Sequence, residues 1–306
     1  MTRLTALRFC ALLAISAGGA MVSAQTLLPS TPPKGFGASV TPAFEGWFDN
    51  ADGTHTFLIG YFNRNTAAEP DVPIGTNNHF EPGNLDMGQP THFLPGRRYG
   101  MFTYTVPKEF AKTQKLAWSI TVNGVTSKVP FYMSPDYNIT PMQASEQGPR
   151  GYNVPPVLRL EPGGGSFTGP LASVAKALSR MATAGIPMPL ELSADDDAQY
   201  SSGTNAPLSG SQAPVLLVIS KYRGEGEVTI AEPKAKMTAT KGGKPDEPFS
   251  GKASTTVTFK DPGEYMLHVT ANDYSGNGGG GAACCWTTAI VKVSVKGESL
   301  RTTGAR

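Results

Sequence analysis

The sequence predicts an all-β protein with two β-sandwich domains that follow a cleaved signal peptide. First, the 306-residue chain contains 35 glycines and 26 prolines and is only 16% charged, which is typical of short strands joined by many turns. Second, several segments alternate apolar and polar residues with the period of two that a half-buried strand shows. Third, Asp-Gly, Asn-Gly and Pro-Gly pairs stand between such segments, where tight turns use them.

The first residues have the three regions of a secretory signal peptide in order. Arg3 and Arg8 form a basic start, residues 9–22 are a short apolar run, and Val22-Ser23-Ala24 is a small-residue cleavage motif. We therefore expect residues 1–24 to be removed and the mature chain to reach the periplasm or the extracellular space. The apolar run is too short for a good spanning helix, and no later run approaches about 18 apolar residues. We expect no membrane insertion after cleavage.

The charge of the chain argues against a polyanionic partner. The formal net charge is +2, and the two arginines of the signal peptide account for it. The mature chain is therefore close to neutral, and we expect no nucleic-acid binding. The sequence also lacks a G-x-S-x-G elbow, an HExxH motif, a P-loop and a dinucleotide fingerprint.

The N-terminal domain is expected at residues 41–136, after a disordered lead-in at residues 25–40. Residues 50–53 contain an Asp-Gly pair between the aromatic runs 44–48 and 56–62, which predicts a hairpin. The second run is apolar on both faces, so we expect it in the middle of a sheet that is covered on both sides.

A second hairpin is predicted over residues 116–131. Asn123-Gly124 suits a two-residue type I′ turn. Folding about that turn places almost only apolar residues on one face and polar residues on the other, which is what a one-sided core requires. The expected cross-strand pairs are Val122 with Val125, Ile120 with Ser127, Trp118 with Val129 and Leu116 with Phe131.

The middle of the chain is less regular. Residues 137–154 are rich in proline and glycine and are predicted to be a linker. Residues 171–184 form the one plausible helix, with Gly185 as its stop, and a strand with a loop is the alternative. The C-terminal domain is expected at residues 155–297, followed by a disordered tail at residues 298–306.

The C-terminal domain shows further strand signals. Residues 215–219 are a candidate buried strand, and residues 255–259 lead into the turn Asp261-Pro262-Gly263, whose proline and glycine indicate type II. Residues 265–271 then alternate apolar and polar side chains, and residues 290–295 form the expected final strand.

The residues from Phe259 to Asp273 resemble the F-x-x-P-G-x-Y-x-L-x-V-x-A-x-D signature of Ig-like and PKD-type β-sandwich domains. The resemblance covers roughly residues 188–297. It implies that Tyr265 begins a core strand after a corner, comparable to the tyrosine corner of Ig folds. The Ig disulfide between facing sheets is absent. The chain is also similar to exported bacterial proteins of unknown function that share FEGW, GYFNRN, QPTHFLPxR and CCW segments. Neither resemblance implies an activity.

Cys284 and Cys285 are adjacent, and four interpretations stay open. They are two free thiols, a vicinal disulfide that forms a rigid apolar bump beneath a ligand, thiolate ligands of a soft metal, or partners in an intermolecular link. A regular strand directs neighbouring side chains to opposite faces. The glycine-rich residues 278–281 before the pair relax that constraint.

A carboxylate cluster is a candidate Ca²⁺ site. Asp195, Asp196 and Asp197 follow a predicted strand, and Asp273 precedes the glycine-rich loop. Ca²⁺ takes six to eight oxygen ligands from carboxylates and carbonyls. The alternative is that these residues are solvated turn residues.

Residues 89–98 combine histidine, aromatic and arginine side chains between prolines, a composition that suits a binding groove. The candidate ligand-binding residues there and on the neighbouring strands are Trp47, Tyr61, Arg64, His92 and Arg97. The aromatic rings offer stacking faces for sugars. The alternative is a rigid loop that packs its apolar residues into the core while arginine stays in water.

These features predict an exported, non-catalytic binding or structural protein of the cell envelope, with a glycan or an envelope protein as its partner. One alternative is a metal or redox protein that uses Cys284 and Cys285. The other is a hydrolase of envelope polysaccharide, for which Glu45 with Asp49 or Asp136 would supply the two carboxylates. No catalytic residue is assigned.

Overall fold

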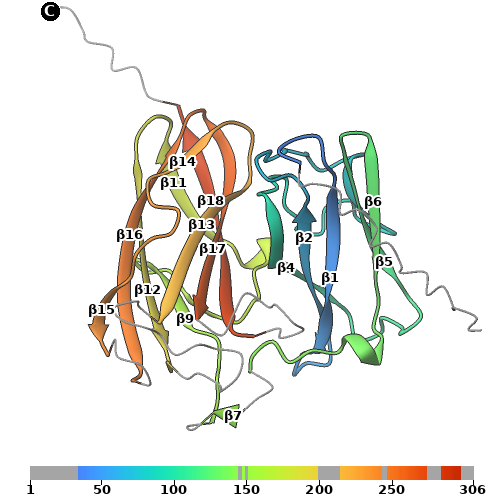
Figure 1. The fold of residues 1–306 in the computed structure, drawn as a ribbon, viewed down its shortest axis with the longest axis horizontal. Helices are drawn as coiled ribbons and strands as arrows, with labels where there is room; N and C mark the ends of the chain where they lie inside the picture. The colour runs from blue at the N-terminus through green and yellow to red at the C-terminus, as the bar shows by residue number, and fades with distance from the viewer. Residues whose placement is uncertain are drawn as a thin grey trace, which may run out of the picture. The chain divides into compact units, whose positions relative to one another are not determined.

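The computed structural model describes residues 34–143, 147–148, 151–198, 214–242, 247–273 and 284–297. The regular elements of these residues are strands and short 3₁₀ segments, so the prediction of an all-β protein is confirmed (Figure 1). The predicted signal peptide, residues 25–33 of the predicted lead-in and the predicted tail lie outside the described residues. No helix in the described ranges is long and apolar enough to cross a membrane.

The first half of the described chain forms two three-stranded antiparallel sheets, with the strand orders β1-β2-β4 and β3-β5-β6. The strands are β1 (Val40–Asp49), β2 (His55–Asn63), β3 (Asn78–Glu81), β4 (Gly96–Val106), β5 (Leu116–Val122) and β6 (Val125–Phe131). β2 is the middle strand of its sheet, and almost all of its residues are buried. The sequence predicts this burial, because the strand is apolar on both of its faces.

Both predicted hairpins are confirmed. β1 and β2 pair antiparallel up to Asp49 and His55, and the backbone N–H of Asn50 donates to the carbonyl of Thr54 over 2.8 Å. β5 and β6 pair in the predicted register. The φ angles of Asn123 (52°) and Gly124 (75°) are the left-handed values that a type I′ turn uses.

The core of this first half is aromatic. The Trp118 indole stacks on Phe80, with ring centres 5.7 Å apart, and meets the edge of Phe102 at 5.5 Å. Its Nε1–H donates to Oδ1 of the fully buried Asn78 over 2.8 Å. The Asn78 Nδ2 in turn donates to the carbonyls of Val72 (2.9 Å) and Pro90 (2.8 Å). A buried polar network of this kind fixes the loop before β4 against the sheet.

The second half forms a six-stranded sheet with the order β10-β9-β12-β16-β14, to which β15 pairs through β16, and a four-stranded sheet with the order β11-β18-β17-β13. The β11–β18 pair is parallel and the other pairs are antiparallel. The strands of the six-stranded sheet are β9 (Val157–Glu161), β10 (Ser166–Thr168), β12 (Met188–Asp196), β14 (Val228–Ile230), β15 (Thr238–Lys241) and β16 (Phe249–Phe259). Those of the four-stranded sheet are β11 (Leu178–Thr183), β13 (Val215–Arg223), β17 (Gly263–Asp273) and β18 (Trp286–Lys296).

The second core takes apolar side chains from both of these sheets, among them Leu192 of β12 and Leu267 of β17. The turn after Phe259 joins β16 of one sheet to β17 of the other. The Tyr265 hydroxyl closes this connection by donating to the Asp261 carbonyl over 2.9 Å. Short strands β7 (Gln147–Gly148) and β8 (Gly151–Tyr152) pair with each other.

The prediction of a helix at residues 171–184 is wrong, and the alternative of a strand with a loop is confirmed. The segment contains the 3₁₀ turn η2 (Val174–Lys176) and strand β11 (Leu178–Thr183). Its alanines, leucines and lysine suit a helix locally, but β11 pairs in parallel with β18, more than 100 residues away. Tertiary pairing overrides a weak helix propensity.

The described parts of the expected lead-in and linker are packed against the fold. The Ala38 N–H donates to Asn65 Oδ1 over 2.7 Å, so residues 34–40 are not a disordered lead-in. In the linker, the Ile139 N–H donates to the Trp47 carbonyl over 2.9 Å, and Asn153 is only 1% exposed. The 3₁₀ turn η1 (Pro135–Tyr137) precedes this contact. Proline and glycine here shape ordered connections.

The two halves share packing as well as a chain. Tyr222 of β13 is fully buried in the first core, and its hydroxyl donates to the Gly88 carbonyl over 2.5 Å. Arg223 makes a bidentate ion pair with Asp86 at 2.8 and 3.0 Å. Residues from both halves therefore complete the first core, and a single compact unit holds all the described residues.

Candidate functional site

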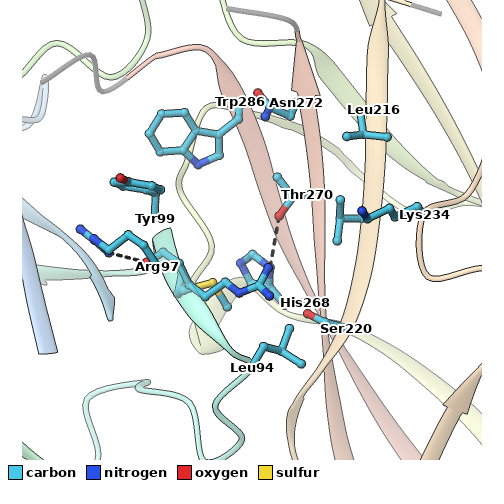
Figure 2. Close-up of a pocket in the computed structure, with 13 residues that line it drawn as sticks. Leu94, Arg97, Tyr99, Leu216, Ser220, Lys234, His268, Thr270, Asn272 and Trp286 are labelled. Atoms are coloured by element: carbon cyan, nitrogen blue, oxygen red, sulfur yellow. Dashed lines mark hydrogen bonds between the residues drawn. The ribbon is translucent and has the colours of Figure 1, made fainter. Parts of the chain in front are cut away.

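The four-stranded sheet has one face in the second core and another that meets the first half. Side chains alternate along β13 and β17, so Leu217 and Val269 fill the second core while Val218 and His268 lie on the opposite face. β4 and the residues before it approach that opposite face and leave a cavity of about 230 Å³. We call this cavity the seam pocket. Side chains of β4, β13, β17, the start of β18 and Lys234 line it (Figure 2).

Arg97 lines the seam pocket and makes its polar contacts within the chain. Its Nη2 pairs with Glu45 Oε1 at 2.8 Å, and its Nη1 donates to the carbonyls of Tyr61 (3.1 Å) and Arg98 (2.6 Å). The guanidinium also covers the Tyr99 ring, 4.2 Å from its centre. These contacts fix the Arg97 guanidinium in the lining of the pocket, because charge-assisted hydrogen bonds within the chain occupy its donors.

Two other cations line the pocket without an acidic partner. Arg98 donates from Nε to the Pro95 carbonyl over 3.1 Å, and no carboxylate in the described part of the chain lies within ion-pair distance of its guanidinium. Lys234 is exposed and likewise has no ion pair there. The lining contains no aspartate or glutamate. The pocket therefore carries uncompensated positive charge, which is complementary to an anion.

Trp286 forms the apolar back wall and adds a donor. The residue is 3% exposed, and its buried Nε1–H has no hydrogen-bond partner among the described residues. The indole lies directly against Gly100 of β4, where a Cβ would come within 2.8 Å of the ring. Gly100 also has a left-handed φ of 51°, which glycine adopts without strain. Buried indole N–H groups usually find an acceptor, so the geometry leaves one donor for a ligand.

His268 lies in the floor of the pocket as a neutral side chain. It is 2% exposed and stacks on Tyr222 with ring centres 5.8 Å apart. Burial lowers the pKa of His268 to about 4, and the charge of Arg98 acts in the same direction. Ser220 is its cross-strand neighbour on β13, yet no hydrogen bond joins the two side chains in the described structure.

The candidate ligand-binding residues do not gather in one groove. Trp47 is 8% exposed and donates from Nε1 to the Ser134 carbonyl over 2.7 Å, and Tyr61 is fully buried. His92 is 9% exposed and contacts Asp71 at 2.9 Å and Glu69 at 3.3 Å. Arg64 and Arg97 complete this candidate set: Arg64 lies 4.8 Å over the Phe62 ring, and Arg97 lines the seam pocket. The aromatic rings that suggested sugar stacking are thus mostly core.

The aspartate run does not converge as a unit, because consecutive strand residues face opposite sides. Asp195 lies on the outer face and pairs with Arg159 at 2.5 Å, whereas Asp196 points inward and is 7% exposed. Burial raises the pKa of Asp196 to about 8, and the charge of Asp273, which is 2% exposed, acts in the same direction. Asp197 has the intermediate exposure of Asp195. Among the described residues no three His, Cys, Asp or Glu side chains gather around one point.

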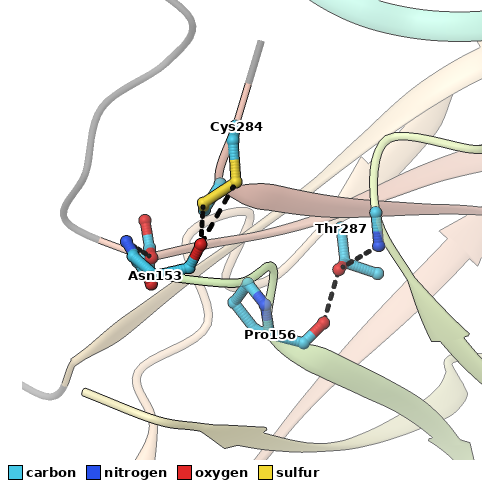
Figure 3. Close-up of a disulfide and its surroundings, with 7 residues drawn as sticks. Asn153, Pro156, Cys284 and Thr287 are labelled. Atoms are coloured by element: carbon cyan, nitrogen blue, oxygen red, sulfur yellow. Dashed lines mark hydrogen bonds between the residues drawn. A yellow bond between two sulfur atoms is a disulfide. The ribbon is translucent and has the colours of Figure 1, made fainter. Parts of the chain in front are cut away.

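Cys284 and Cys285 are bonded to each other as a disulfide (Figure 3). Both are buried, at 4% and 0% exposed. Of the four interpretations that the sequence left open, this bond corresponds to the vicinal disulfide. The Cys285 Sγ lies 3.4 Å from the Asn153 carbonyl oxygen, and Thr287 two residues on donates to the Pro156 carbonyl. The pair therefore anchors the start of β18 to the segment before β9.

The carboxylates proposed for hydrolysis have other roles. Glu45 is buried and ion-paired with Arg97. Asp49 pairs with His55 at 2.6 Å beside the first hairpin, and Asp136 is exposed in η1. A glycosidase requires two carboxylates that face each other across a substrate. In the described part of the chain, Glu45 and Asp49 each contact a basic side chain instead.

Sequence reasoning missed Arg98, Lys234, His268 and Trp286 as pocket residues. One signal was available. The face of β13 and β17 that points away from the second core carries Val218, Ser220, His268 and Thr270, a mixture too apolar for a fully solvated face. Such a face indicates that another part of the chain covers it, although the sequence does not say which part.

Comparison with known proteins does not assign the chain to a family. No protein-family model matches the chain, and no curated protein matches it. Among solved structures, domains 4 and 5 of the S-layer protein SbsC align with 85% of this chain and 98% of that one, at 12% identity and a TM-score of 0.20. A likeness at that TM-score carries no argument, so a function has to be argued from the geometry.

Proposed function

We propose that the protein is an exported, non-catalytic binding module of the cell envelope, and that the seam pocket binds a carboxylate-bearing sugar of an envelope glycan. The observation that carries this proposal is the pair Arg98 and Lys234. Both cations line the pocket without an acidic partner in the described part of the chain, and no carboxylate lines it. A desolvated guanidinium forms strong, bidentate hydrogen bonds with a carboxylate.

The remaining lining suits the rest of a sugar ring. Trp286 supplies an apolar face and an unused N–H donor, and Thr270 and Ser220 supply hydroxyl groups. The volume of about 230 Å³ is below the roughly 300–1,000 Å³ of most small-molecule sites. One monosaccharide unit at a chain end or branch therefore suits the pocket better than an internal stretch of polymer.

The finer description of the fold belongs to the same proposal. We interpret the two sheet pairs as two β-sandwiches, each around its own core. The Tyr265 hydroxyl bonds the Asp261 carbonyl four residues upstream, which supports an Ig-like or PKD-like second sandwich with a tyrosine corner. The sequence of residues 1–24 supports export.

The proposal is tested by isothermal titration calorimetry of the mature chain with glucuronate and with glucose. We expect glucuronate to bind and glucose to bind at least tenfold more weakly. Arg98→Met should weaken glucuronate binding about tenfold or more, because it removes charge-assisted hydrogen bonds of about 1.5–3 kcal/mol. Lys234→Met should weaken it a few-fold, because an ion pair of an exposed lysine is worth about 1 kcal/mol or less. Binding should also weaken as salt rises, since exposed charges such as Lys234 are screened.

Two control variants also remove one positive charge each, but at positions outside the seam pocket. Lys236→Met removes another exposed lysine two residues away, and Arg64→Met removes an arginine that stacks on Phe62 outside the pocket. Neither should change glucuronate binding. Glucuronate binding that the controls weaken as much as the pocket variants, or no binding at millimolar glucuronate, would refute the proposal.

A further inference from the structure

Glu45 and Arg97 form a largely buried ion pair beside the seam pocket. The Glu45 Oε1 lies 2.8 Å from the Arg97 Nη2, and the Glu45 Oε2 accepts the Gly100 N–H over 2.8 Å. The Glu45 side chain is only 8% exposed. Gly60 of β2 leaves the space for this pair, since a Cβ at that position would collide with Glu45 Oε1 and Arg97 Nη1. The strands therefore bury one carboxylate against a guanidinium that itself lines the pocket (Figure 2).

The surroundings of Glu45 offset its burial only in part. The elements packed against β1 and β4 at this point carry the charged or titratable side chains Arg97, Arg98 and Tyr99 (β4), Asp136 and Tyr137 (η1) and, across the pocket, His268 and Lys234. Arg97 is the cation that pairs with Glu45. One guanidinium and one backbone N–H do not replace the water that a carboxylate loses on burial. Burial therefore raises the pKa of Glu45 to about 7.

Protonation of Glu45 changes the charge beside the pocket without releasing Arg97. The Arg97 Nη1 donates to the carbonyls of Tyr61 (3.1 Å) and Arg98 (2.6 Å), and its guanidinium covers the Tyr99 ring. None of these contacts involves the Glu45 carboxyl, so they hold the guanidinium in either protonation state. An ionised Glu45 offsets the charge of Arg97. A neutral Glu45 leaves that charge to attract an anion together with the charge of Arg98.

We propose that Glu45, acting through Arg97, makes the seam pocket bind a carboxylate more tightly as the pH falls through neutrality. The inference rests on the proposed function, because it concerns the same pocket and the same class of ligand. Glu45 does not touch the ligand and acts only on the charge beside it. Linkage is reciprocal, so an anionic ligand must also disfavour the ionised form of Glu45. The protein should therefore take up protons when a carboxylate binds near neutral pH.

Calorimetric titration of the mature chain with glucuronate at about pH 6 and about pH 8.5, at one ionic strength, tests the inference. Glucuronate stays ionised across this range, and the pKa of His268, about 4, lies outside it. Glu45 is mostly protonated at the lower pH and mostly ionised at the higher pH. We therefore expect the affinity to be about fivefold or more higher at pH 6. Titrations near pH 7 in Tris and in imidazole, two cationic buffers with different heats of ionisation, should show net proton uptake on binding.

Glu45→Gln fixes the neutral form of the side chain. This variant should bind glucuronate at both pH values with the affinity that the wild-type chain shows at pH 6, and without proton uptake. Glu109→Gln is the matched control, because it removes an exposed glutamate of the β4–β5 loop, outside the pocket. It should keep the pH dependence of the wild-type chain.

The outcomes separate this inference from the function on which it rests. Wild-type affinity that stays constant between the two pH values overturns the inference alone, and so does an unchanged pH dependence in Glu45→Gln. If Glu45→Gln does not fold, the wild-type chain decides, because the absence of proton uptake near pH 7 also overturns the inference. Absence of glucuronate binding at pH 6 refutes the proposed function, and this inference with it.

Discussion

Replacing Glu45 by glutamine should remove a large pH dependence of stability. The Glu45 carboxylate is buried, with its side chain 8% exposed, although Arg97 lies 2.8 Å away and the Gly100 N–H donates to it over 2.8 Å. Burial raises the pKa of Glu45 from 4.5 to about 7, outweighing the lowering by Arg97 and by these hydrogen bonds. Removal of a charge from water is costly even when a partner is present.

The size and sign of the effect follow from linkage. A shift from 4.5 to about 7 is worth about 3 kcal/mol, at about 1.36 kcal/mol per pKa unit. Because the folded-state pKa lies above the unfolded-state pKa, the folded state favours the protonated carboxyl. Its contribution is complete below about pH 4.5, is lost as the pH rises to about 7, and is absent above that.

The assay is urea unfolding of the wild-type chain and of Glu45→Gln at several pH values from 4.5 to 8.5. Other groups titrate too: the pKa of His268 is lowered to about 4, so its contribution is lost as the pH falls below 6.5. Such groups are common to both proteins and cancel in the difference of the two unfolding free energies. We expect wild-type stability relative to Glu45→Gln to fall by about 3 kcal/mol between pH 4.5 and pH 7.5. A difference that stays constant across this range would show that the Arg97 ion pair, and not burial, controls Glu45.

Three further substitutions test the packing. Asn78→Ala should cost at least about 3 kcal/mol of unfolding free energy by urea denaturation, because it leaves the Trp118 indole N–H and two carbonyls unpaired in the first core. Gly100→Ala should cost at least about 2 kcal/mol and weaken glucuronate binding, because its φ of 51° is left-handed and its Cβ would press on Trp286. Leu267→Ala should cost about 2–5 kcal/mol by thermal or urea unfolding, because it opens a cavity in the second core.

Each of these substitutions has a control of the same chemical type. Asn84→Ala, Gly165→Ala and Leu85→Ala are the controls, in the same order. Asn84 is exposed, Gly165 is exposed with open space at its Cβ position, and Leu85 is 50% exposed. We expect changes within about 0.5 kcal/mol for surface changes of this kind. Equal losses in a control and in its buried counterpart would contradict the assigned packing.

The local elements of the fold were predictable because their signals are local. Asn123-Gly124 with period-two alternation on either side predicted the β5–β6 hairpin in its observed register. The helix prediction at residues 171–184 failed because the same local composition was overridden by parallel pairing of β11 with β18. The site residues were predicted poorly for a related reason. Aromatic and histidine side chains such as Trp47 and His92 are as suitable for a core as for a groove, and their burial depends on what packs over them.

The sequence by itself determined that the chain is all-β and where its tight turns lie, because turn chemistry and side-chain alternation involve residues within a few positions of each other. The tertiary structure alone decided which charges in the described part of the chain are paired and which are not. Arg97 finds Glu45 across two strands while Arg98 finds no carboxylate in the described chain. The Asn153 amide bonds the Asp273 carboxylate across 120 positions. Such contacts depend on how distant segments are brought together, and no local pattern encodes them.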